Sequence, residues 1–366
     1  MYDVAIIGAG PAGATLARLI GKTCKVLMLE RRGLLDRYRE SSPGKCCGGL
    51  LAPDAQNMLA HFGLGVPRDV LVGPQLFTVR TIDVRNSRER YYQRHYINMD
   101  RERFDRYIVS LLPATVDIRC NCQVREVETG KGSGKVRFSA AGRDYEEDAR
   151  LIVAADGASS SCARRFICRK RSPRVYVAVQ EWFVSVKALP YYSVIFDDEI
   201  SDYFCWTIPK DEFLIVGAAL LPGKEAHKSF EKLKVRLREM GFNLERSVKK
   251  NGSMLFRPMA TGHLCYGLDN LAFIGEAGGF ISPTSGEGLS YAFRSALALA
   301  EALNEGGESV VHRYERKGCN LKKNLLLKCV KLPFMYNRNL RNLVMASGIR
   351  SMDLHSLVKS EQGISE

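Results

Sequence analysis

The residues with the clearest chemical role stand near the start of the chain. Gly8, Gly10 and Gly13 form a Gly-x-Gly-x-x-Gly pattern directly after the apolar run Val4–Ile7. The first glycine permits a tight turn from strand to helix, the second lets the backbone approach a diphosphate, and the third lets the helix pack on the sheet. The unpaired amides at the helix start then face the anion. The pattern predicts a dinucleotide-binding βαβ unit, with Ala12 in the same turn.

An acidic residue at the end of the second predicted strand supports this assignment. Glu30 follows the apolar strand at residues 25–29 and lies 17 residues after Gly13. A carboxylate at this distance can accept hydrogen bonds from the ribose hydroxyls of the adenosine. We assign Arg31 to the same site. The pairing fits FAD or NAD and disfavours NADP, and the βαβ unit alone leaves both open.

Later segments resemble motifs of the p-hydroxybenzoate-hydroxylase-like flavoproteins and select FAD. Arg101 begins an Arg-x-x-Phe-Asp helix start, and in that family this arginine meets the flavin cofactor. Asp156 stands in a segment that resembles the family's Asp-Gly motif, which follows a buried strand. Val124, in an alternating run, is assigned to the same cofactor site.

Two further segments complete the expected FAD site. Gly275 and Glu276 occupy a segment that resembles the family's Gly-Asp motif, whose acidic residue binds the ribityl chain. This chain has Glu where Asp is usual. A helix predicted to start near Gly286, Gly288 and Leu289 would direct its first amides toward the flavin pyrimidine carbonyl.

Three more segments resemble the geranylgeranyl reductase family of FAD-dependent oxidoreductases. Residues 43–49 resemble its Cys-Gly loop, which approaches the flavin, and residues 283–288 match its Pro-x-x-Gly-Glu-Gly stretch. Residues 204–209, with Gly217 following, resemble its aromatic-x-Trp-x-Phe-Pro…Gly motif. Within the family, the run at residues 47–56 most resembles the bacterial CbrA-like members.

The resemblance implies that the protein reduces carbon-carbon double bonds of an isoprenoid or similarly apolar substrate. Flavin N5 would deliver a hydride to one carbon, and a protein acid or water would protonate the other. Cys47 is the candidate catalytic residue, and it is expected beside the flavin together with Gly48. The aromatic side chains predicted to line a long apolar substrate cavity are Phe196, Tyr203, Trp206 and Phe280. For each of these aromatics, and for the thiol, core packing is the alternative interpretation.

Two other functions stay open at this stage. Residues 204–209 also resemble the halogenase Trp-x-Trp-x-Ile-Pro motif, which makes an oxygen-dependent FAD monooxygenase or halogenase the first alternative. Phe204 replaces its first Trp, and this counts against halogenation. The second alternative is a flavin-bound, non-catalytic, membrane-associated protein. The sequence also departs from the reductase motif at Ile208 and Ala219, which leaves the substrate open.

The electron donor is not built into the chain. One dinucleotide fingerprint is present, and the glycine-rich residues 130–135 lie between alternating runs that predict a β-hairpin. We therefore expect reducing equivalents from transiently bound NAD(P)H, from a ferredoxin-like carrier or from a quinol.

The expected fold class is α/β, or α+β overall. It comprises a Rossmann-like FAD-binding domain, an inserted antiparallel β-sheet substrate domain and a helical C-terminal tail. The FAD-binding domain is predicted at residues 1–70, 96–165 and 264–310. The substrate domain is predicted at residues 71–95 and 166–263, and the basic tail at 311–366. In this tail residues 321–330 are amphipathic, and Pro333 is expected to interrupt the helix.

Charge is concentrated in the tail. The 366-residue chain has a formal charge of +14, and from residue 311 onward eleven Lys and Arg stand against four Asp and Glu. Together with many apolar residues, this suits an anionic membrane surface or an anionic substrate. A solvated basic face on a packed helix is the alternative. The sequence contains no recognised nucleic-acid module, so we expect no nucleic-acid partner.

Cysteine and histidine spacing indicates the compartment. The eleven cysteines are odd in number and form no Cys-x-x-Cys pair, which favours a reducing cytoplasm over a disulfide framework. The six histidines show no metal-ligand spacing, so we expect no metal. A strand predicted to begin at Tyr2 leaves no room for a signal peptide, and no window has about 20 uncharged apolar residues. We expect a cytoplasmic protein that could also lie at the inner face of the membrane.

Overall fold

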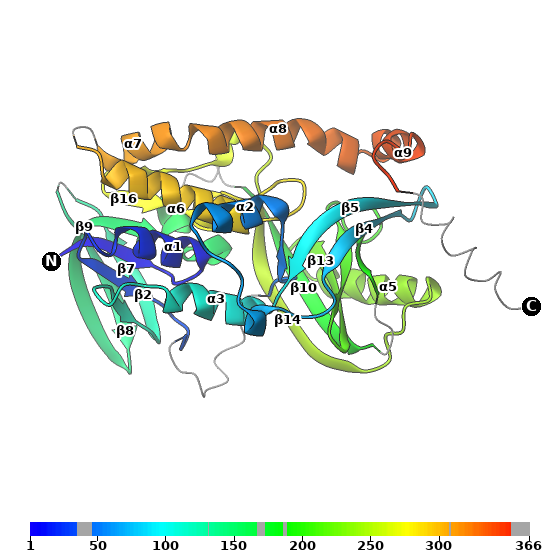
Figure 1. Ribbon diagram of the computed structural model, residues 1–366, viewed down its shortest axis with the longest axis horizontal. Coiled ribbons are helices and arrows are strands. Elements are labelled where there is room, and N and C mark those ends of the chain that lie inside the picture. The colour runs from blue at the N-terminus through cyan, green and yellow to red at the C-terminus, as the bar shows by residue number, and fades with distance from the viewer. Residues whose placement is uncertain (35–45, 131, 167–172, 186–188, 307–308, 353–366) are drawn as a thin grey trace, which may run out of the picture.

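The computed structural model of the protein describes residues 1–34, 46–130, 132–166, 173–185, 189–306 and 309–352. Within these residues the strands form two eight-stranded sheets, one toward each end of the molecule (Figure 1). The predicted fold class, a Rossmann-like sheet with an inserted antiparallel sheet and a helical tail, is confirmed.

The first sheet is built on parallel strands. The order of the sheet is β15-β16-β9-β1-β2-β6, in which β16 to β6 are parallel and β15 pairs antiparallel with β16. An antiparallel β7–β8 hairpin extends β9. The strands are β1 (Tyr2–Ile7), β2 (Val26–Leu29), β6 (Asp117–Arg119), β7 (Cys122–Glu128), β8 (Gly134–Ala140), β9 (Arg143–Ala154), β15 (Gly267–Leu268) and β16 (Leu271–Phe273). The β7–β8 pairing confirms the predicted hairpin around residues 130–135.

Alternate residues of β1 enter two separate cores. Val4 and Ile6 pack with α1 (Pro11–Ile20) and α6 (Leu289–Leu303), whereas Ala5 and Ile7 pack with the β7–β8 hairpin. A strand covered on both faces needs apolar residues at every position, which is why residues 4–7 read as a continuous apolar run.

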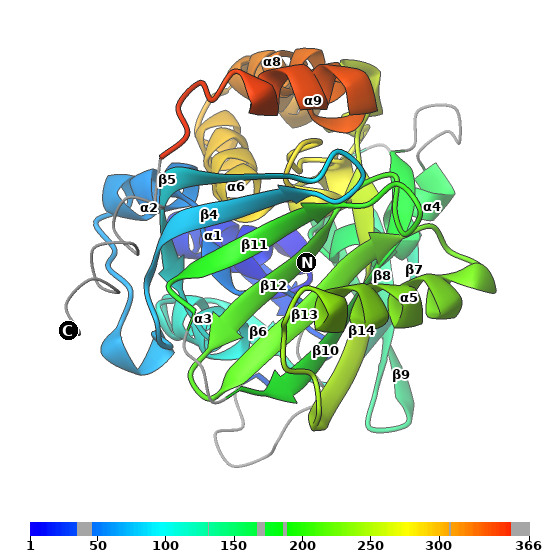
Figure 2. The same cartoon turned by 90° about the vertical axis from the view of Figure 1, so that its right-hand side faces the viewer.

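The second sheet is largely antiparallel, in the order β14-β10-β13-β12-β11-β4-β5-β3, with β4 and β11 parallel. Its strands are β3 (Leu50–Leu51), β4 (Leu76–Asp83), β5 (Arg88–Asn98), β10 (Arg174–Val184), β11 (Tyr191–Phe196), β12 (Cys205–Lys210), β13 (Phe213–Leu220) and β14 (Ser247–Arg257). The helix α5 (Glu225–Glu239) covers the outer face through Phe230, Leu233 and Leu237 (Figure 2). The inner face carries a cluster that includes Tyr203 and Trp206.

The remaining helices are α2 (Pro53–His61), α3 (Arg101–Ser110), α4 (Ser161–Phe166), α7 (Val310–Lys317), α8 (Cys319–Tyr336) and α9 (Arg338–Ala346). The tail is helical as predicted. α7 and α8 form an outer layer above α6, and α9 continues from the end of α8 toward β5 of the second sheet (Figures 1 and 2). Residues 353–366 lie outside the described residues.

The prediction that Pro333 ends a helix was wrong. α8 continues through Pro333 to Tyr336, and the carbonyl of Pro333 accepts from the Asn337 amide at 2.9 Å. Proline removes one backbone hydrogen bond to the preceding turn. Pro333 is exposed and close to the helix end, so the helix tolerates that single loss.

Candidate functional site

The predicted dinucleotide turn has the geometry that its glycines require. Gly8 has a φ of +103°, and a Cβ on Gly13 would lie 2.0 Å from the carbonyl oxygen of Gly8. Beside Gly10, in contrast, no heavy atom lies within 4 Å of where a Cβ would be. No side chain caps the start of α1. The turn therefore leaves open space directly in front of unpaired helix amides. Ala12 packs against Gly275, and so joins this turn to the start of the Gly-Glu motif.

Glu30 is buried beside the glycine turn. Its Oε2 accepts from the Ala9 amide at 2.7 Å, and its Oε1 accepts from the backbone and Nε of Arg32 at 2.9 and 3.0 Å. Arg31, which the sequence assigned to this site, is exposed. The guanidinium next to Glu30 belongs to Arg32, one residue further along the chain.

A line of alternating charges runs from Glu30 toward the Cys-Gly loop. Arg32 pairs with Asp105 at 3.0 Å, Asp105 pairs with Arg101 at 2.8 Å, and Arg101 Nη1 donates to Cys47 Sγ at 3.3 Å. Burial alone would lower the pKa of Arg101, but Asp105 and Cys47 outweigh it and raise that pKa above its ordinary value. Arg101 is thereby fixed as a cation between a carboxylate and a thiol.

The described part of the Cys-Gly loop, residues 46–49, lies against the inner face of the second sheet, and residues 43–45 lie outside the described residues. Gly49 has a φ of +61° and donates its amide to Cys47 Sγ at 3.5 Å. A Cβ on Gly48 would lie 2.5 Å from Ile208 Cδ1, so the loop backbone passes close to β12 at this position. When the side-chain oxygen of Gln180 faces the loop, it accepts hydrogen bonds from Gly48 N at 3.3 Å and from Trp206 Nε1 at 3.1 Å.

Lys210 lies beside this loop, and the sequence did not predict it as a site residue. It ends β12 with 4% of its surface exposed, and its Nζ donates to the carbonyls of Gly49 at 3.1 Å and Met99 at 2.6 Å. Burial lowers the pKa of Lys210 to about 7, although the nearby Cys47 and Asp100 act in the opposite direction. The feature of the sequence that could have indicated Lys210 is its position directly after Pro209, the last residue of the motif at residues 204–209.

Cys47, Arg101 and Lys210 line one cavity of about 320 Å³. Its wall combines apolar side chains with charged and polar ones. The lining residues are Cys47, Gly49, Val72, Met99, Asp100, Arg101, Glu102, Arg103, Gln180, Trp182, Lys210, Asp211, Glu212, Phe213, Lys249 and Asn251.

None of the four aromatic residues predicted to line the substrate cavity lines this one. Trp206 lies across Gly217, where a Cβ would be 2.2 Å from its indole ring. Tyr203 packs on Tyr336 of α8 at 5.4 Å, and Phe196 packs on the same ring at 5.7 Å.

Phe280 lies elsewhere, in the core of the first sheet against Tyr266 and Tyr314. The structure therefore places Phe280 apart from the other three predicted aromatics. All four side chains are at most 6% exposed, so core packing accounts for each of them in the described structure.

The later flavin motifs approach one another at the join between the sheets. The Gly275 amide donates to Ser295 Oγ at 2.9 Å, and the buried Glu276 accepts from the Phe256 amide at 3.0 Å. Glu276 thus links the first-sheet motif to the end of β14. Asp156 accepts from the Ser161 amide at 3.3 Å.

The remaining predicted positions lie at the edges of this arrangement. Gly286 has a φ of +63°, and α6 begins at Leu289 after Gly288, as predicted. Glu287 caps the helix by accepting from the amide of Ser290 at 2.7 Å. Val124 is half-buried on β7, where it packs against the core of that face of the first sheet.

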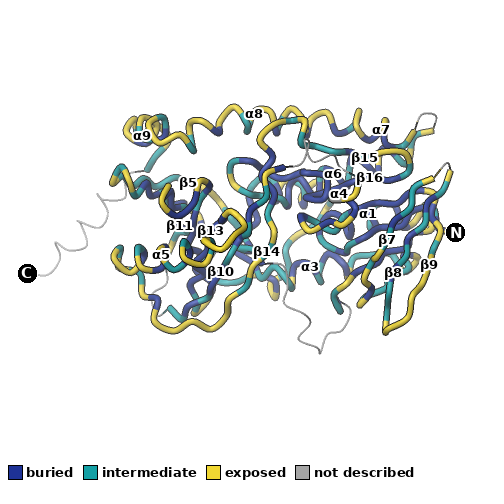
Figure 3. The backbone as a smooth tube through the Cα atoms, turned by 180° about the vertical axis from the view of Figure 1, so that it is seen from behind, coloured by how far each residue is buried: buried dark blue, intermediate teal, exposed yellow. Residues whose placement is uncertain are grey.

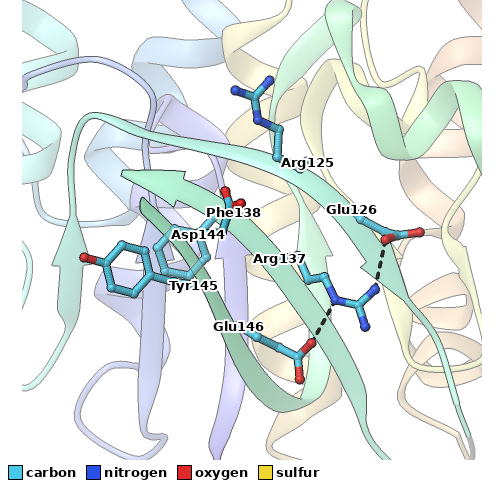
Figure 4. A pocket seen from close by; sticks show the side chains of 7 residues that line it. All are labelled: Arg125, Glu126, Arg137, Phe138, Asp144, Tyr145 and Glu146. Atoms are coloured by element: carbon cyan, nitrogen blue, oxygen red, sulfur yellow. Dashed lines mark hydrogen bonds and ion pairs between the residues drawn. The ribbon is translucent and has the colours of Figure 1, made fainter. Parts of the chain in front are cut away.

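A second depression, of about 370 Å³, lies on the β7–β9 strands and contains none of these residues (Figure 4). There Arg137 pairs with Glu126 at 2.9 Å and with Glu146 at 2.8 Å. These side chains are about 40% exposed, and such surface pairs contribute little. Among the described residues, no group of three or more His, Cys, Asp or Glu is placed to hold a metal.

The glycine turn, the buried Glu30 and the motifs at the join between the sheets define a flavin-binding oxidoreductase fold. Solved structures share it. A geranylgeranyl bacteriochlorophyll reductase-like protein from Thermoplasma acidophilum matches with a TM-score of 0.69 and 18% identity, covering 98% of this chain and 90% of that one. The p-nitrophenol 4-monooxygenase PnpA from Pseudomonas putida DLL-E4 matches with a TM-score of 0.70 and 17% identity, covering 96% and 94%.

Sequence comparison identifies the family. A family model described as "Lycopene cyclase protein" matches residues 75–326. Protein CbrA from Shigella dysenteriae serotype 1 (strain Sd197) is 39% identical over 348 residues, which cover 95% of this chain and 97% of that protein. The chain belongs to the CbrA-like family of flavin-dependent oxidoreductases, within the wider lycopene cyclase protein family.

Proposed function

We propose that this protein binds FAD and reduces carbon-carbon double bonds of an isoprenoid or similarly apolar substrate. The observation that carries the proposal is the cavity in which Cys47, Arg101 and Lys210 meet, next to residues of the flavin motifs. Bound FAD, once reduced by an external electron donor, would supply the hydride.

The chain offers suitable partners along the whole length of the cofactor. The open space beside Gly10 and the uncapped start of α1 suit the diphosphate. The Glu30 carboxylate suits the adenosine ribose, and Arg101 and Glu276 suit the flavin half. Glu30 already accepts from Arg32, so binding would require that contact to be shared or exchanged.

Lys210 is the best placed proton donor in the cavity. Its amine is anchored by two backbone carbonyls, so its position does not depend on a flexible side-chain contact. A pKa of about 7 leaves it partly protonated at neutral pH and able to release that proton to a carbon. The Cys47 thiol accepts hydrogen bonds from Arg101 and from the Gly49 amide. Through these contacts Cys47 would hold the Cys-Gly loop in place and influence the charge distribution in the cavity.

Two of the comparisons support an isoprenoid as the substrate class. The matching family model is named for lycopene, and the reductase-like structure is named for a geranylgeranyl group. Both names denote isoprenoid chains. Val72, Met99, Trp182 and Phe213 give the cavity wall an apolar part that suits such a chain.

An oxygen-dependent monooxygenase is the second candidate function, because PnpA shares the fold at a similar TM-score. A flavin-bound protein without turnover is the third. The electron donor is proposed to be NAD(P)H, a ferredoxin-like carrier or a quinol.

The three candidates give different results in one experiment. Photoreduced holoenzyme is mixed without oxygen in a stopped-flow instrument with geranylgeranyl lipids and polyprenyl quinones. Return of the oxidised flavin spectrum, together with a saturated product by mass spectrometry, supports the reductase. If no substrate reoxidises the flavin and a substrate then stimulates oxygen consumption, the result supports the monooxygenase. If neither response occurs, the result supports the protein without turnover.

A further inference from the structure

The outer face of the C-terminal helices carries a concentration of exposed apolar side chains. Seven of the seventeen exposed large hydrophobic side chains in the described structure fall within residues 326–349. They are Leu326 (53% exposed), Leu327 (65%), Val330 (61%), Phe334 (50%), Leu343 (65%), Val344 (41%) and Ile349 (68%). Patches of this kind mark interaction surfaces in soluble proteins.

The spacing along α8 shows that its own exposed apolar residues form one stripe. Leu326, Val330 and Phe334 recur every four residues and therefore lie on one side of the helix. Leu321 and Leu325 are buried and lie on the opposite side, toward the protein. A surface helix normally has a single apolar face, which packs on the core, so a second one directed outward needs an occupant.

The charged side chains in this part of the chain are all cationic. Between residues 316 and 352 the chain has nine Lys and Arg and no Asp or Glu. Four of the nine pair inward: Arg316 and Lys317 with Glu305, Lys328 with Asp54, and Arg341 with Asp83. No ion pair within the described part of the chain engages the other five, which are Lys322, Lys323, Lys331, Arg338 and Arg350.

We propose that the outer face of α8 and α9 docks on an anionic phospholipid membrane. Apolar residues would enter the headgroup boundary, and the unpaired cations would contact the negative surface, as in interfacial amphipathic helices. No described helix is long and apolar enough to cross a bilayer. The surface lies along one edge of the molecule, and the backbone there is largely exposed or intermediate (Figure 3).

Charge complementarity favours a membrane over a second copy of this chain. A symmetric dimer through the stripe would bring the same lysines of two copies together, and such like-charge contacts are unfavourable. An anionic lipid surface satisfies both the apolar stripe and the cations at once.

The test is flotation of the purified holoenzyme with vesicles of phosphatidylcholine alone or with 30% phosphatidylglycerol. The protein should float with the anionic vesicles and remain largely unbound with phosphatidylcholine, and 0.5 M NaCl should release it. The variant Leu327→Glu/Val330→Glu should lose flotation. Lys323→Gln and Lys331→Gln should each lower partitioning about fivefold.

The matched control is Phe77→Glu/Val235→Glu, which places two charges at similarly exposed apolar positions on β4 and α5 (57% and 52%). It should float like the wild type. Flavin absorbance of each variant reports that it is folded. Absence of flotation, or equal flotation with both vesicle types, would overturn the proposal. So would a wild-type dimer, measured by light scattering, that Leu327→Glu/Val330→Glu converts to a monomer while vesicles fail to bind.

Discussion

At the residue scale, the site is organised by contacts between groups that are far apart in sequence. Arg32 joins Asp105 across 73 positions, and Arg101 joins Cys47 across 54. Each buried charge in this line has an opposite partner, which is the condition under which buried charges are tolerated. The line connects the adenosine end of the predicted cofactor site to the cavity. A change at either end therefore alters the electrostatics of the other.

Replacing Lys210 tests its role as proton donor. Lys210→Met should lower turnover with an alkene substrate about a hundredfold or more, the usual contribution of a general acid. Because the donor is active when protonated, wild-type turnover should fall as the pH rises through about 7. This fall in turnover with rising pH should be absent in Lys210→Met. The measurement is anaerobic single-turnover reoxidation of the flavin as a function of pH.

Two further variants separate proton donation from positioning. Lys210→Arg keeps a cation and hydrogen-bond donors but cannot release a proton, so it should stay slow. Lys234→Met removes another buried lysine, which pairs with Glu181 at 3.0 Å outside the cavity. It should keep the wild-type pH profile. Full activity in Lys210→Arg would show that the residue acts by charge alone.

Replacing Glu30 tests its proposed role in holding the cofactor. Glu30→Ala should weaken FAD binding about tenfold to a hundredfold, because it removes charge-assisted hydrogen bonds to the ribose. It also releases the Ala9 amide and Arg32. The ratio of flavin to protein absorbance after dialysis measures the effect. Glu30→Gln, which keeps the shape, should retain more FAD than the alanine variant, and full occupancy in Glu30→Ala would contradict the assignment.

Residue-scale prediction from sequence succeeded where a local pattern specified the position. The turn at Gly8, Gly10 and Gly13 has the predicted geometry because its constraints lie within six residues. Lys210 was missed because its partner Gly49 is 161 positions away, and no local pattern records that pairing. The contact of Arg32 with Glu30 was not predicted for a related reason, since only the placement of Asp105 decides which side chain turns inward. The assignment of Arg31 to the cofactor site stays a prediction.

At the scale of elements, the aromatic motif is explained by packing. Trp206 on β12 lies across Gly217 on β13, and the two residues are paired in register between these antiparallel strands. Trp206 also donates to Gln180, which in turn accepts from the Cys-Gly loop at Gly48. The motif therefore holds the loop against the sheet. Trp206, predicted from sequence to line the substrate cavity, is a buried part of this support.

Gly217→Ala should damage that support. The new Cβ would lie 2.2 Å from the indole of Trp206, so the ring must move and its bond to Gln180 is strained. Such overpacking costs about 1–3 kcal/mol. Urea unfolding should show this loss, with a change in tryptophan fluorescence.

The matched control for Gly217 is another strand glycine with room beside it. A Cβ on Gly252 of β14 would meet its nearest atom at 3.4 Å, which is ordinary contact. Gly252→Ala should therefore leave stability within about 0.5 kcal/mol of the wild type. Equal effects of the two substitutions would contradict the argument from the Trp206 contact.

Element types were predictable where periodicity was strong. The buried parallel strand, the β7–β8 hairpin and the helical tail all follow from local alternation or helical spacing. The end of α8 was not predictable in this way. Pro333 signals a break, but helix geometry up to Tyr336 is favoured by tertiary contacts of Tyr336 with Phe196 and Tyr203.

At the scale of the whole molecule, the C-terminal helices tie the two sheets together. α8 lies over α6, which packs on the first sheet, while Tyr336 and α9 reach the second (Figure 1). Arg257 of β14 lies between the rings of Tyr203 and Tyr336, 4.0 Å from each ring centre. Desolvated cation–π contacts of this kind contribute about 2 kcal/mol or more. The proposed membrane face is therefore the outer side of a helical layer whose inner side packs on the second sheet.

The contact of α9 with the second sheet can be tested at the ion pair between Arg341 and Asp83. Arg341 Nε lies 2.7 Å from Asp83 Oδ2 on β4, and the two side chains are 4% and 0% exposed. Burial alone would raise the pKa of Asp83, but hydrogen bonds from Arg341 and Asn86 outweigh it and hold that pKa below its ordinary value. The resulting stability is therefore fully present above the ordinary pKa of aspartate. It is lost as the pH falls through the lower value of the folded protein.

Arg341→Met should lower the free energy of unfolding by about 3–5 kcal/mol at pH 7, because it leaves the Asp83 carboxylate buried without its cation. Urea unfolding, followed by circular dichroism, measures the loss. The double variant Arg341→Met/Asp83→Asn removes the stranded charge and should recover a large part of it. The deficit of the single variant should shrink as the pH falls below the ordinary pKa of aspartate, because the stranded carboxylate takes up a proton while the wild type progressively loses the stabilisation of its ion pair. A loss below about 1 kcal/mol at pH 7 would show that α9 is held mainly by apolar contacts, such as that of the buried Met345.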